Sequence, residues 1–219
     1  MLMNCSRQSG KSTVAGVRAL HEALYKPGSL TLILAPAERQ AQELFSKVAA
    51  FYRQLGHAPS PDSDRKTGMA LANDSRIEAL PGSNERTIRG FSGVDLLVVD
   101  EAARVLDELY YALRPMLAVS GGAVMMLSTP AGKRGVFYEE WTGSGPWERY
   151  EVPATACPRI SPEFLKDERR SLPERVYRQE YFCSFEEAEG QVFSEAAIQA
   201  AISEEVEPIH FDFEGAMAS

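Results

Sequence analysis

The stretch CSRQSGKST, residues 5–13, stands near the start of the chain, and a run with helical spacing follows it to Tyr25. A phosphate chain is bound by inward-facing backbone N–H groups, by a mobile cation and by a hydroxyl that holds Mg²⁺. Here Gly10 permits close backbone approach, Lys11 supplies the cation, and Ser12 is the expected magnesium ligand. The usual pattern has glycine where this chain has Cys5. Because Gly-Lys-Ser also occurs in plain surface turns, the stretch needs a second signal.

The second signal is an acid pair at the end of an apolar run. Leu96–Val99 has the composition of a buried strand, and Asp100 and Glu101 follow it. A parallel strand delivers such carboxylates to the ligand edge of its sheet. Asp100 would orient Mg²⁺ through its water shell, and Glu101 would polarise the attacking water as general base. A solvated pair capping the next helix is the simpler alternative, but two motifs in the right order favour catalysis.

A third signal closes the next apolar run, Ala123–Leu127, with Ser128, Thr129 and Pro130. A hydroxyl at this position would lie beside the γ-phosphate, and Thr129 could couple its release to motion. A strand-terminating turn is the alternative, since Thr-Pro is ordinary in turns. The order of phosphate loop, acid pair and hydroxylated strand end is that of helicase-like motors, which favours the functional interpretation.

Short β-rich runs alternate with longer helical stretches, which is typical of an α/β domain with a mostly parallel sheet. The predicted strands are Leu30–Ala35, Arg76–Leu80, Val94–Val99, Ala123–Leu127 and Glu148–Val152. The predicted helices are Thr13–Tyr25, Glu38–Leu55, Ala102–Leu117, Val136–Trp141, Pro162–Ser171, Pro173–Phe182 and Ser194–Ser203. The polar stretch His57–Gly68 is predicted to be a loop. Only four residues precede Cys5, so we expect any strand before the phosphate loop to be at best a stub.

The composition is that of an ordinary globular chain of 219 residues, with 44% hydrophobic and 25% charged residues. No apolar run reaches the roughly 20 residues that span a bilayer, and no signal peptide is evident, so we expect no membrane partner. Cys5, Cys157 and Cys183 lack metal-ligand spacing and predict reduced, intracellular thiols. The net charge of −8 argues against nonspecific coating of nucleic acid, but a local basic stripe could still contact DNA.

The phosphate loop, with its arginine and without its first glycine, resembles that of the terminase large subunits, which package viral DNA. Other matches follow in the family's order: Ala35-Pro36 with Gln40, PGS at 81–83, TIRG at 87–90, VDEA at 99–102, STP at 128–130, and YFCSF at 181–185 leading to EGQVF at 189–193. The resemblance covers nearly the whole chain. It is most specific at the phosphate loop and at EGQVF.

The resemblance implies a three-layer P-loop NTPase of the additional-strand, RecA/helicase-like type, with its core at 1–144 and a small helical lid and linker at 145–219. It implies a homo-oligomeric ring in the bacterial host cytoplasm that hydrolyses ATP with Mg²⁺ and drives double-stranded DNA into a procapsid. The terminase small subunit and the portal would be its partners. The residues expected around the nucleotide are Arg7, Gln8, Ser9, Gly10, Lys11, Ser12 and Thr13.

The resemblance also suggests roles for arginines. Arg7 would reach the γ-phosphate in cis, and Arg89, or less well Arg86, would act in trans on a neighbouring subunit's ATP. An arginine finger contributes roughly 10³–10⁵ in rate. The alternative for each arginine is an ion pair with a surface carboxylate, and for Arg89 the two interpretations are evenly balanced.

The chain departs from the family at both ends. Family members carry a first strand and adenine contacts before the phosphate loop, so we expect an incomplete adenine pocket here. They also continue into a metal-dependent nuclease, for which this chain offers only Asp212, so we expect no nuclease activity. Two competing functions remain: a helicase-like translocase, for which a second RecA-like domain does not fit, and a nonhydrolysing nucleotide-binding or assembly module from a prophage remnant.

Overall fold

The computed structural model describes residues 1–56, 61, 63–81, 90–187 and 200–201. Contacts divide the chain into two units, Met1–Glu186 and Glu187–Ser219. Every helix and strand given below lies in the first unit. Within the described residues, no helix combines the length and the apolar character needed to cross a membrane.

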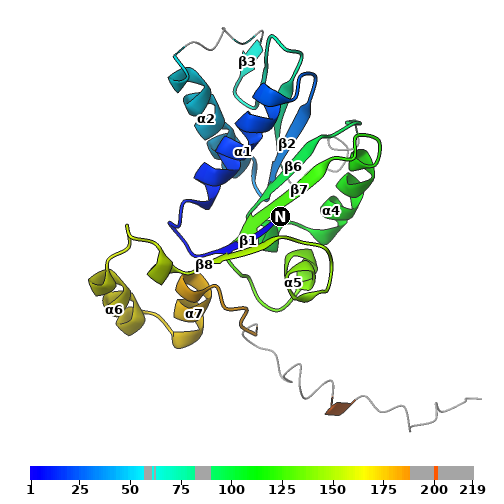
Figure 1. The fold of residues 1–219 in the computed structure, drawn as a ribbon. Coiled ribbons are helices and arrows are strands. Elements are labelled where there is room, and N and C mark those ends of the chain that lie inside the picture. Colours follow the sequence, from blue (N-terminus) through cyan, green and yellow to red (C-terminus); the bar gives the residue numbers. More distant parts are fainter. Residues whose placement is uncertain (57–60, 62, 82–89, 188–199, 202–219) are drawn as a thin grey trace, which may run out of the picture. The chain divides into compact units, whose positions relative to one another are not determined.

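An eight-stranded sheet with the order β3-β4-β5-β2-β6-β7-β1-β8 runs through the first unit (Figure 1). The strands are β1 (Leu2–Cys5), β2 (Leu30–Ala35), β3 (Ser63–Arg65), β4 (Gly68–Ala70), β5 (Arg76–Pro81), β6 (Leu96–Asp100), β7 (Ala123–Ser128) and β8 (Arg149–Val152). Neighbouring strands pair in parallel across the six strands β5, β2, β6, β7, β1 and β8. At one edge, β4 pairs antiparallel with both β5 and β3. The prediction of a mostly parallel sheet is confirmed.

Strand β7 lies between β1 and β6 and pairs in parallel with both of them. The strand that leads into the phosphate loop and the strand that carries the acid pair are therefore separated by one additional strand, as predicted. Because all three strands run in the same direction, Cys5, Asp100 and Ser128 lie at the same edge of the sheet.

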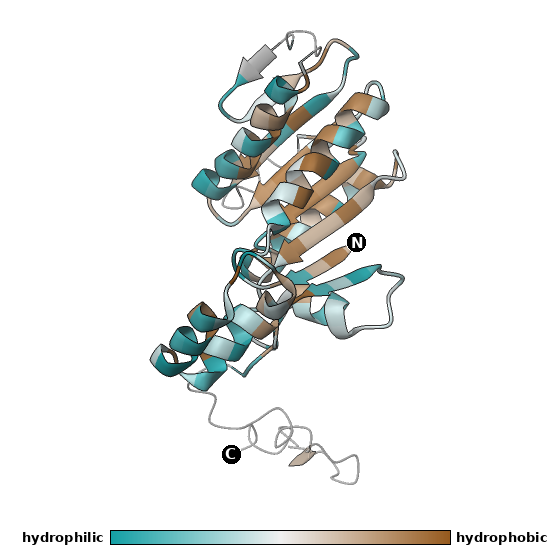
Figure 2. Cartoon of the chain, turned by 60° about the vertical axis from the view of Figure 1, so that its left-hand side comes forward, coloured by the Kyte–Doolittle hydropathy of each residue, from teal (hydrophilic) through white to brown (hydrophobic). Residues whose placement is uncertain are grey.

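Helices cover both faces of the sheet, which makes three layers (Figure 1). Helices α1 (Lys11–Tyr25) and α2 (Glu38–Gln54) lie on one face, and α4 (Asp107–Leu113) and α5 (Gly135–Thr142) on the other. Along β6, Val98 packs with the first pair and Val99 with the second. Both faces of the strands are thus buried, which explains their continuous apolar sequences. Figure 2 shows these hydrophobic strands between helices with hydrophilic outer sides.

The predicted single helix Ala102–Leu117 is wrong. The structure has the short 3₁₀ turn η1 (Ala102–Arg104), then α4, then a second 3₁₀ turn, η2 (Arg114–Leu117). Val105 and Leu106 are extended and interrupt the run. Pro115 lacks a backbone N–H and stands in the first turn of η2, where a new helical segment tolerates it. The apolar spacing of this stretch concealed both breaks.

One loop prediction is also corrected. The described part of His57–Gly68 contains β3, which forms a hairpin with β4. Its three residues are polar, so the hydrophobic pattern gave no strand signal. The residues before the phosphate loop form the short strand β1, whose four residues are all buried and pair with β7 on one side and β8 on the other.

Two helices follow β8: α6 (Pro162–Ser171) and α7 (Glu174–Phe182). Ser161 caps α6 by accepting a hydrogen bond from the Phe164 N–H at 3.2 Å. The buried residues Ala154, Leu165, Tyr177 and Tyr181 form a small core beneath the pair. The predicted helix Ser194–Ser203 lies, except for its residues 200 and 201, outside the described residues.

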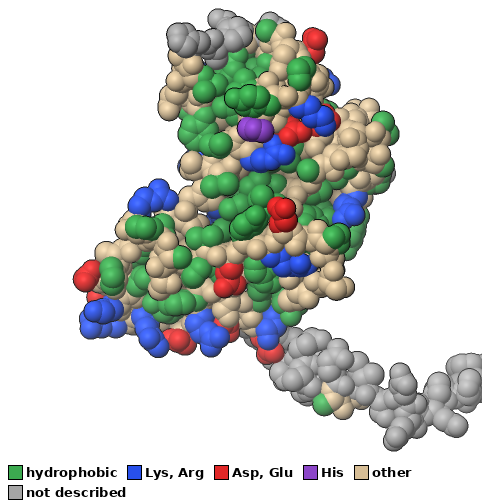
Figure 3. Space-filling view, in the orientation of Figure 1, with side chains coloured by type: hydrophobic (Ala, Val, Ile, Leu, Met, Phe, Trp, Pro, Cys, Tyr) green, Lys and Arg blue, Asp and Glu red, His purple; other side chains and the backbone are tan. Residues whose placement is uncertain are grey.

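The exposed surface over the α6–α7 pair carries charges of both signs (Figure 3). Arg169 lies 3.7 Å from Glu174, and Arg170 lies 3.6 Å from Asp167, with all four side chains well exposed. Exposed pairs of this kind contribute at most about 1 kcal/mol each. The surface therefore lacks the single-sign field that would attract a polyanion such as DNA.

Candidate active site

The loop between β1 and α1 has the backbone of an anion cradle. Gln8 has φ of 60° and Gly10 has φ of 96°, both in the left-handed region. This conformation is uncommon for a residue with a side chain, and alternation of handedness turns backbone N–H groups to one side of a loop. Helix α1 has no side-chain hydrogen bond at its N-cap, so no side-chain oxygen caps the N–H groups of its first turn. The predicted phosphate loop therefore has a suitable backbone.

Lys11 joins the three sequence motifs. Its Nζ lies 3.3 Å from Oε1 of Glu101, and it donates a hydrogen bond to Oγ1 of Thr129 at 3.2 Å. The Lys11 side chain is 10% exposed, and Thr129 is buried. A cation in this position can reach a phosphate group on the loop while it contacts the acid pair and the end of β7.

Ser12 and Asp100 bring two hard oxygen donors together. The Ser12 hydroxyl donates to Oδ2 of Asp100 at 3.4 Å, and the Glu101 N–H donates to Oδ1 at 2.9 Å. Burial, and then the charge of Glu101, raises the pKa of Asp100. The described residues include no group of three or more His, Cys, Asp or Glu side chains that could hold a metal ion. A pair of oxygen donors suits Mg²⁺, which takes most of its ligands from phosphates and water.

Glu101 is held in a strained conformation at the end of β6. Its φ and ψ of 49° and 42° lie in the left-handed region, which costs of order 1 kcal/mol or more for such a residue. The carboxylate lies between two cations, 3.3 Å from Lys11 Nζ and 3.0 Å from Nη1 of Arg104. This turn places the acidic side chain beside Lys11 of the loop.

Sequence reasoning missed Arg104 and Glu180. Arg104 donates to Glu101 and, at 3.4 Å, to the Thr129 carbonyl, so it ties η1 to the end of β7. Glu180 of α7 lies 3.3 Å from Nε of Arg7 and 3.9 Å from Nη2 of Arg104. The spacing of three residues between Glu101 and Arg104 was a usable signal. Nothing in the sequence pointed to Glu180, because α7 approaches the site only through the tertiary fold.

A cavity of about 420 Å³ lies over the loop. Six of the residues predicted around the nucleotide line it: Arg7, Gln8, Gly10, Lys11, Ser12 and Thr13. Ser9 is turned to the loop itself, where its hydroxyl donates to the Ser6 carbonyl at 2.9 Å. Glu43 and Lys47 of α2 and Arg159 after β8 also line the cavity, and none of them was predicted.

Of the arginines proposed to stabilise transition-state charge, the structure describes only Arg7. The Arg7 side chain is 70% exposed and is paired with Glu180. Arg89 and Arg86 lie outside the described residues, as does Asp212.

Cys5, Cys157 and Cys183 are free and buried. Burial raises the pKa of Cys5 to about 11 and that of Cys183 to about 12, which keeps both thiols protonated. Cys5 packs with the core beneath α1 and α2 rather than toward the cavity. This orientation explains how the loop tolerates a side chain in place of the usual glycine.

A model of the family described as "Terminase large subunit, T4likevirus-type, N-terminal" matches residues 2–200. The chain belongs to the terminase large subunit family. This confirms the resemblance read from the sequence. The terminase large subunit of Thermus phage G20c is 27% identical over 227 residues, covering 86% of this chain and 46% of the relative. That of Escherichia phage T5 is 26% identical over 197 residues, covering 86% and 44%. The chain spans about half the length of these curated relatives.

Solved terminase structures have the same fold. The large terminase ATPase domain of Thermus phage P74-26 superposes with a TM-score of 0.74 at 24% identity, over 84% of this chain and 88% of that one. The large terminase of another thermophilic bacteriophage, in complex with ADP, gives a TM-score of 0.71 at 12% identity, over 84% and 47%. The predicted P-loop NTPase fold is thereby confirmed.

Proposed function

We propose that this terminase chain binds and hydrolyses ATP with Mg²⁺, and that hydrolysis drives double-stranded DNA into a procapsid. The observation that carries the proposal is the convergence of Lys11, Ser12, Asp100, Glu101 and Thr129 at one edge of the sheet. The names of the P74-26 ATPase domain and of the terminase solved in complex with ADP agree with a nucleotide site on this fold.

Each side chain has a role that follows from its position. Lys11 and the loop N–H groups bind the β- and γ-phosphates. Ser12 and Asp100 would hold Mg²⁺, and the ion would neutralise phosphate charge. Glu101 accepts a proton from the attacking water, and Arg104 positions its carboxylate.

The remaining roles concern charge that develops on the transferred group. Arg7 is exposed enough to leave Glu180 and reach the γ-phosphate, and Thr129 couples phosphate release to the end of β7. Arg89 acts on a neighbouring subunit's ATP, with Arg86 as the alternative. In this proposal residues 1–144 form the catalytic core, and residues 145–219 form the lid and linker.

The proposed setting follows from the family. The chain works as a homo-oligomeric ring in the bacterial host cytoplasm, with the terminase small subunit and the portal as partners. A trans arginine requires a neighbour, so an isolated monomer turns over slowly.

Steady-state phosphate release from Mg-ATP tests the proposal, measured over a range of protein concentrations with and without linear double-stranded DNA. We expect turnover per chain to rise with concentration, to increase with DNA and to vanish in Lys11→Ala. A folded protein with no turnover under any of these conditions would contradict the ATPase proposal. Turnover that depends on neither concentration nor DNA would contradict the motor.

A further inference from the structure

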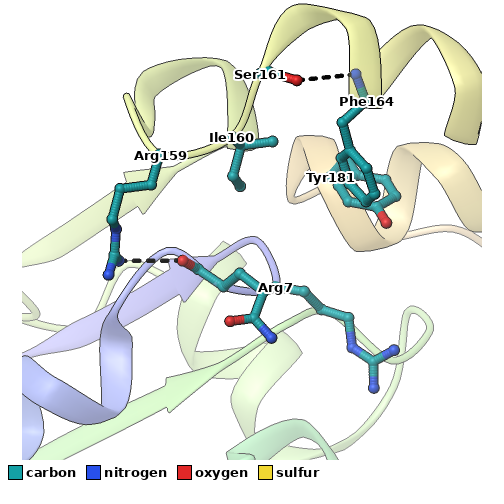
Figure 4. A pocket seen from close by; sticks show the side chains of 7 residues that line it. Arg7, Arg159, Ile160, Ser161, Phe164 and Tyr181 are labelled. Carbon is teal, nitrogen blue, oxygen red and sulfur yellow. Dashed lines mark hydrogen bonds between the residues drawn. The ribbon is translucent and has the colours of Figure 1, made fainter.

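Among the described residues, the cations that line the cavity over the phosphate loop are Arg7, Lys11, Lys47 and Arg159. Three of them are held by acceptors of the protein itself. Arg7 and Lys11 form ion pairs with carboxylates, and Arg159 donates to the Gln8 carbonyl at 3.2 Å, a bond drawn in Figure 4. No hydrogen bond or ion pair joins Lys47 to another described residue. Lys47 can therefore contact a ligand without breaking a contact of this kind.

The close packing of α1 against α2 sets the position of Lys47 along the cavity. The two helices meet at Gly16, where a Cβ would lie 3.2 Å from Cε2 of Phe51 and 3.7 Å from Cγ2 of Val48. Strands β1 and β2 belong to the parallel part of the sheet, so the helices that follow them begin at the same edge. Ser12 is one helical turn before Gly16, and Lys47 is one turn before Phe51. This register places Lys47 on the side of the cavity that Ser12 lines.

The surroundings of Lys47 leave its ammonium group to the cavity. The residue is partly buried, and a lysine so placed packs its stem and keeps its charged end toward solvent. Glu43 stands four residues earlier, at a spacing that favours a Glu–Lys pair on a helix, but these two form no ion pair although both line the cavity. Burial raises the pKa of Asp100, and Lys11 and Lys47 are among the charges that oppose this rise. The charge of Lys47 therefore reaches the acid pair.

Ser12 marks the part of the loop that serves the outer phosphates, since it is the expected ligand of the ion that bridges them. The terminal phosphate spreads its charge over three oxygens, so it offers acceptors to more than one cation. Lysine suits such a contact, because its ammonium group is a compact charge with three donors on a flexible stem. An ammonium group on the Ser12 side of the cavity has the terminal phosphate as its natural acceptor.

We propose that Lys47 is a second lysine of the phosphate site and donates to the terminal phosphate of bound ATP. This proposal rests on the proposed function, since it assigns one more contact to the same ligand. ADP lacks the terminal phosphate, so Lys47 contributes to the affinity for ATP and not to that for ADP. The contact joins α2 to the phosphate loop through the ligand, and departure of the terminal phosphate releases it.

Calorimetric titrations with a nonhydrolysable Mg-ATP analogue and with Mg-ADP test this contact. Lys47→Met keeps the length of the side chain and removes its charge. A hydrogen bond between charged groups is strong enough to change an affinity about tenfold, so we expect this variant to weaken the analogue by about that factor. The affinity for ADP should stay within about twofold of the wild-type value. Lys47→Gln should give the same pattern, so a folding defect in one variant does not decide the result.

Two further variants control for structure. Lys47→Arg keeps a cation at this position and should bind the analogue within about threefold of the wild type, because a guanidinium can also donate to a phosphate. Arg53→Met removes a cation from the last turn of the same helix, where the side chain is exposed and does not line the cavity. We expect Arg53→Met to bind both nucleotides as the wild type does.

Three results would overturn the role of Lys47. They are unchanged binding of the analogue by the Lys47→Met and Lys47→Gln variants, equal weakening of both nucleotides in them, and equally weak binding of the analogue by Arg53→Met. In each case the site around Lys11 stands. A wild-type chain that binds neither nucleotide would instead overturn the proposed function, and the role of Lys47 with it.

Discussion

Replacement of Glu101 by glutamine isolates the role of its charge. The amide keeps the size of the side chain and can still accept a hydrogen bond from Arg104, but it cannot take a proton from water. A positioned general base contributes typically 10²–10⁴ in rate, so we expect turnover to fall by about that factor.

The same substitution should tighten nucleotide binding. In the wild type, Lys11 Nζ lies 3.3 Å from the Glu101 carboxylate. At an effective dielectric constant near 20, the gross attraction is about 5 kcal/mol. The cost of removing both charged groups from water offsets most of this attraction. The Lys11 and Glu101 side chains are 10% and 23% exposed, so we take the net free energy of the ion pair as about 1 kcal/mol. When this competition is removed, Lys11 is released to the phosphates, and affinity should rise about fivefold.

Two assays on the same preparation test this prediction: steady-state phosphate release, and calorimetric titration with a nonhydrolysable Mg-ATP analogue. Glu139→Gln, at an exposed carboxylate of α5, is the control and should behave as the wild type. Turnover of Glu101→Gln at the wild-type rate would refute its role as the base. Weaker binding of the analogue would refute the competition for Lys11.

Three further substitutions test parts of the site. Since burial raises the pKa of Asp100 in the folded chain, wild-type stability falls as pH rises through the unfolded value near 4 toward the folded one. The melting temperature of Asp100→Asn relative to the wild type should therefore increase as pH rises above about 4, and phosphate release should be lost. A difference in melting temperature that does not change with pH would contradict this. Gly10→Ala places a side chain at a backbone φ of 96°, directed toward Arg159. Denaturation should show an unfolding free energy lower by about 1–2 kcal/mol, and titration should show weaker ATP binding. Tyr181→Phe removes the hydrogen bond to Glu168 and should lower the free energy of unfolding in urea by about 1 kcal/mol. An unchanged urea midpoint would show that this hydrogen bond does not stabilise the fold.

The parallel sheet and the convergence of its motifs were accessible from the sequence. Strands buried on both faces have continuous apolar sequences, so β2, β6 and β7 stood out from their surroundings. The direction of parallel strands then required the residues after β6 and β7 to meet at one edge. These inferences needed only local composition and one topological rule.

Other features depend on interactions that local pattern does not record. The turn at Glu101 depends on a left-handed residue that is not glycine, which the composition does not indicate. Strand β3 is polar and short, so its pairing with β4 defines it rather than its own sequence. Arg159 and Glu180 reach the loop only because β8 pairs with β1 and carries α6 and α7 with it.

A single-turnover experiment tests the central claim most directly. Protein in excess over γ-labelled Mg-ATP is quenched at increasing times, and bound ATP, ADP and free phosphate are measured together. The account predicts that bound ATP is converted to ADP and phosphate, and that Glu101→Ala binds ATP without converting it. ATP that stays bound and intact on the wild-type chain would contradict hydrolysis and identify a nucleotide-binding module instead.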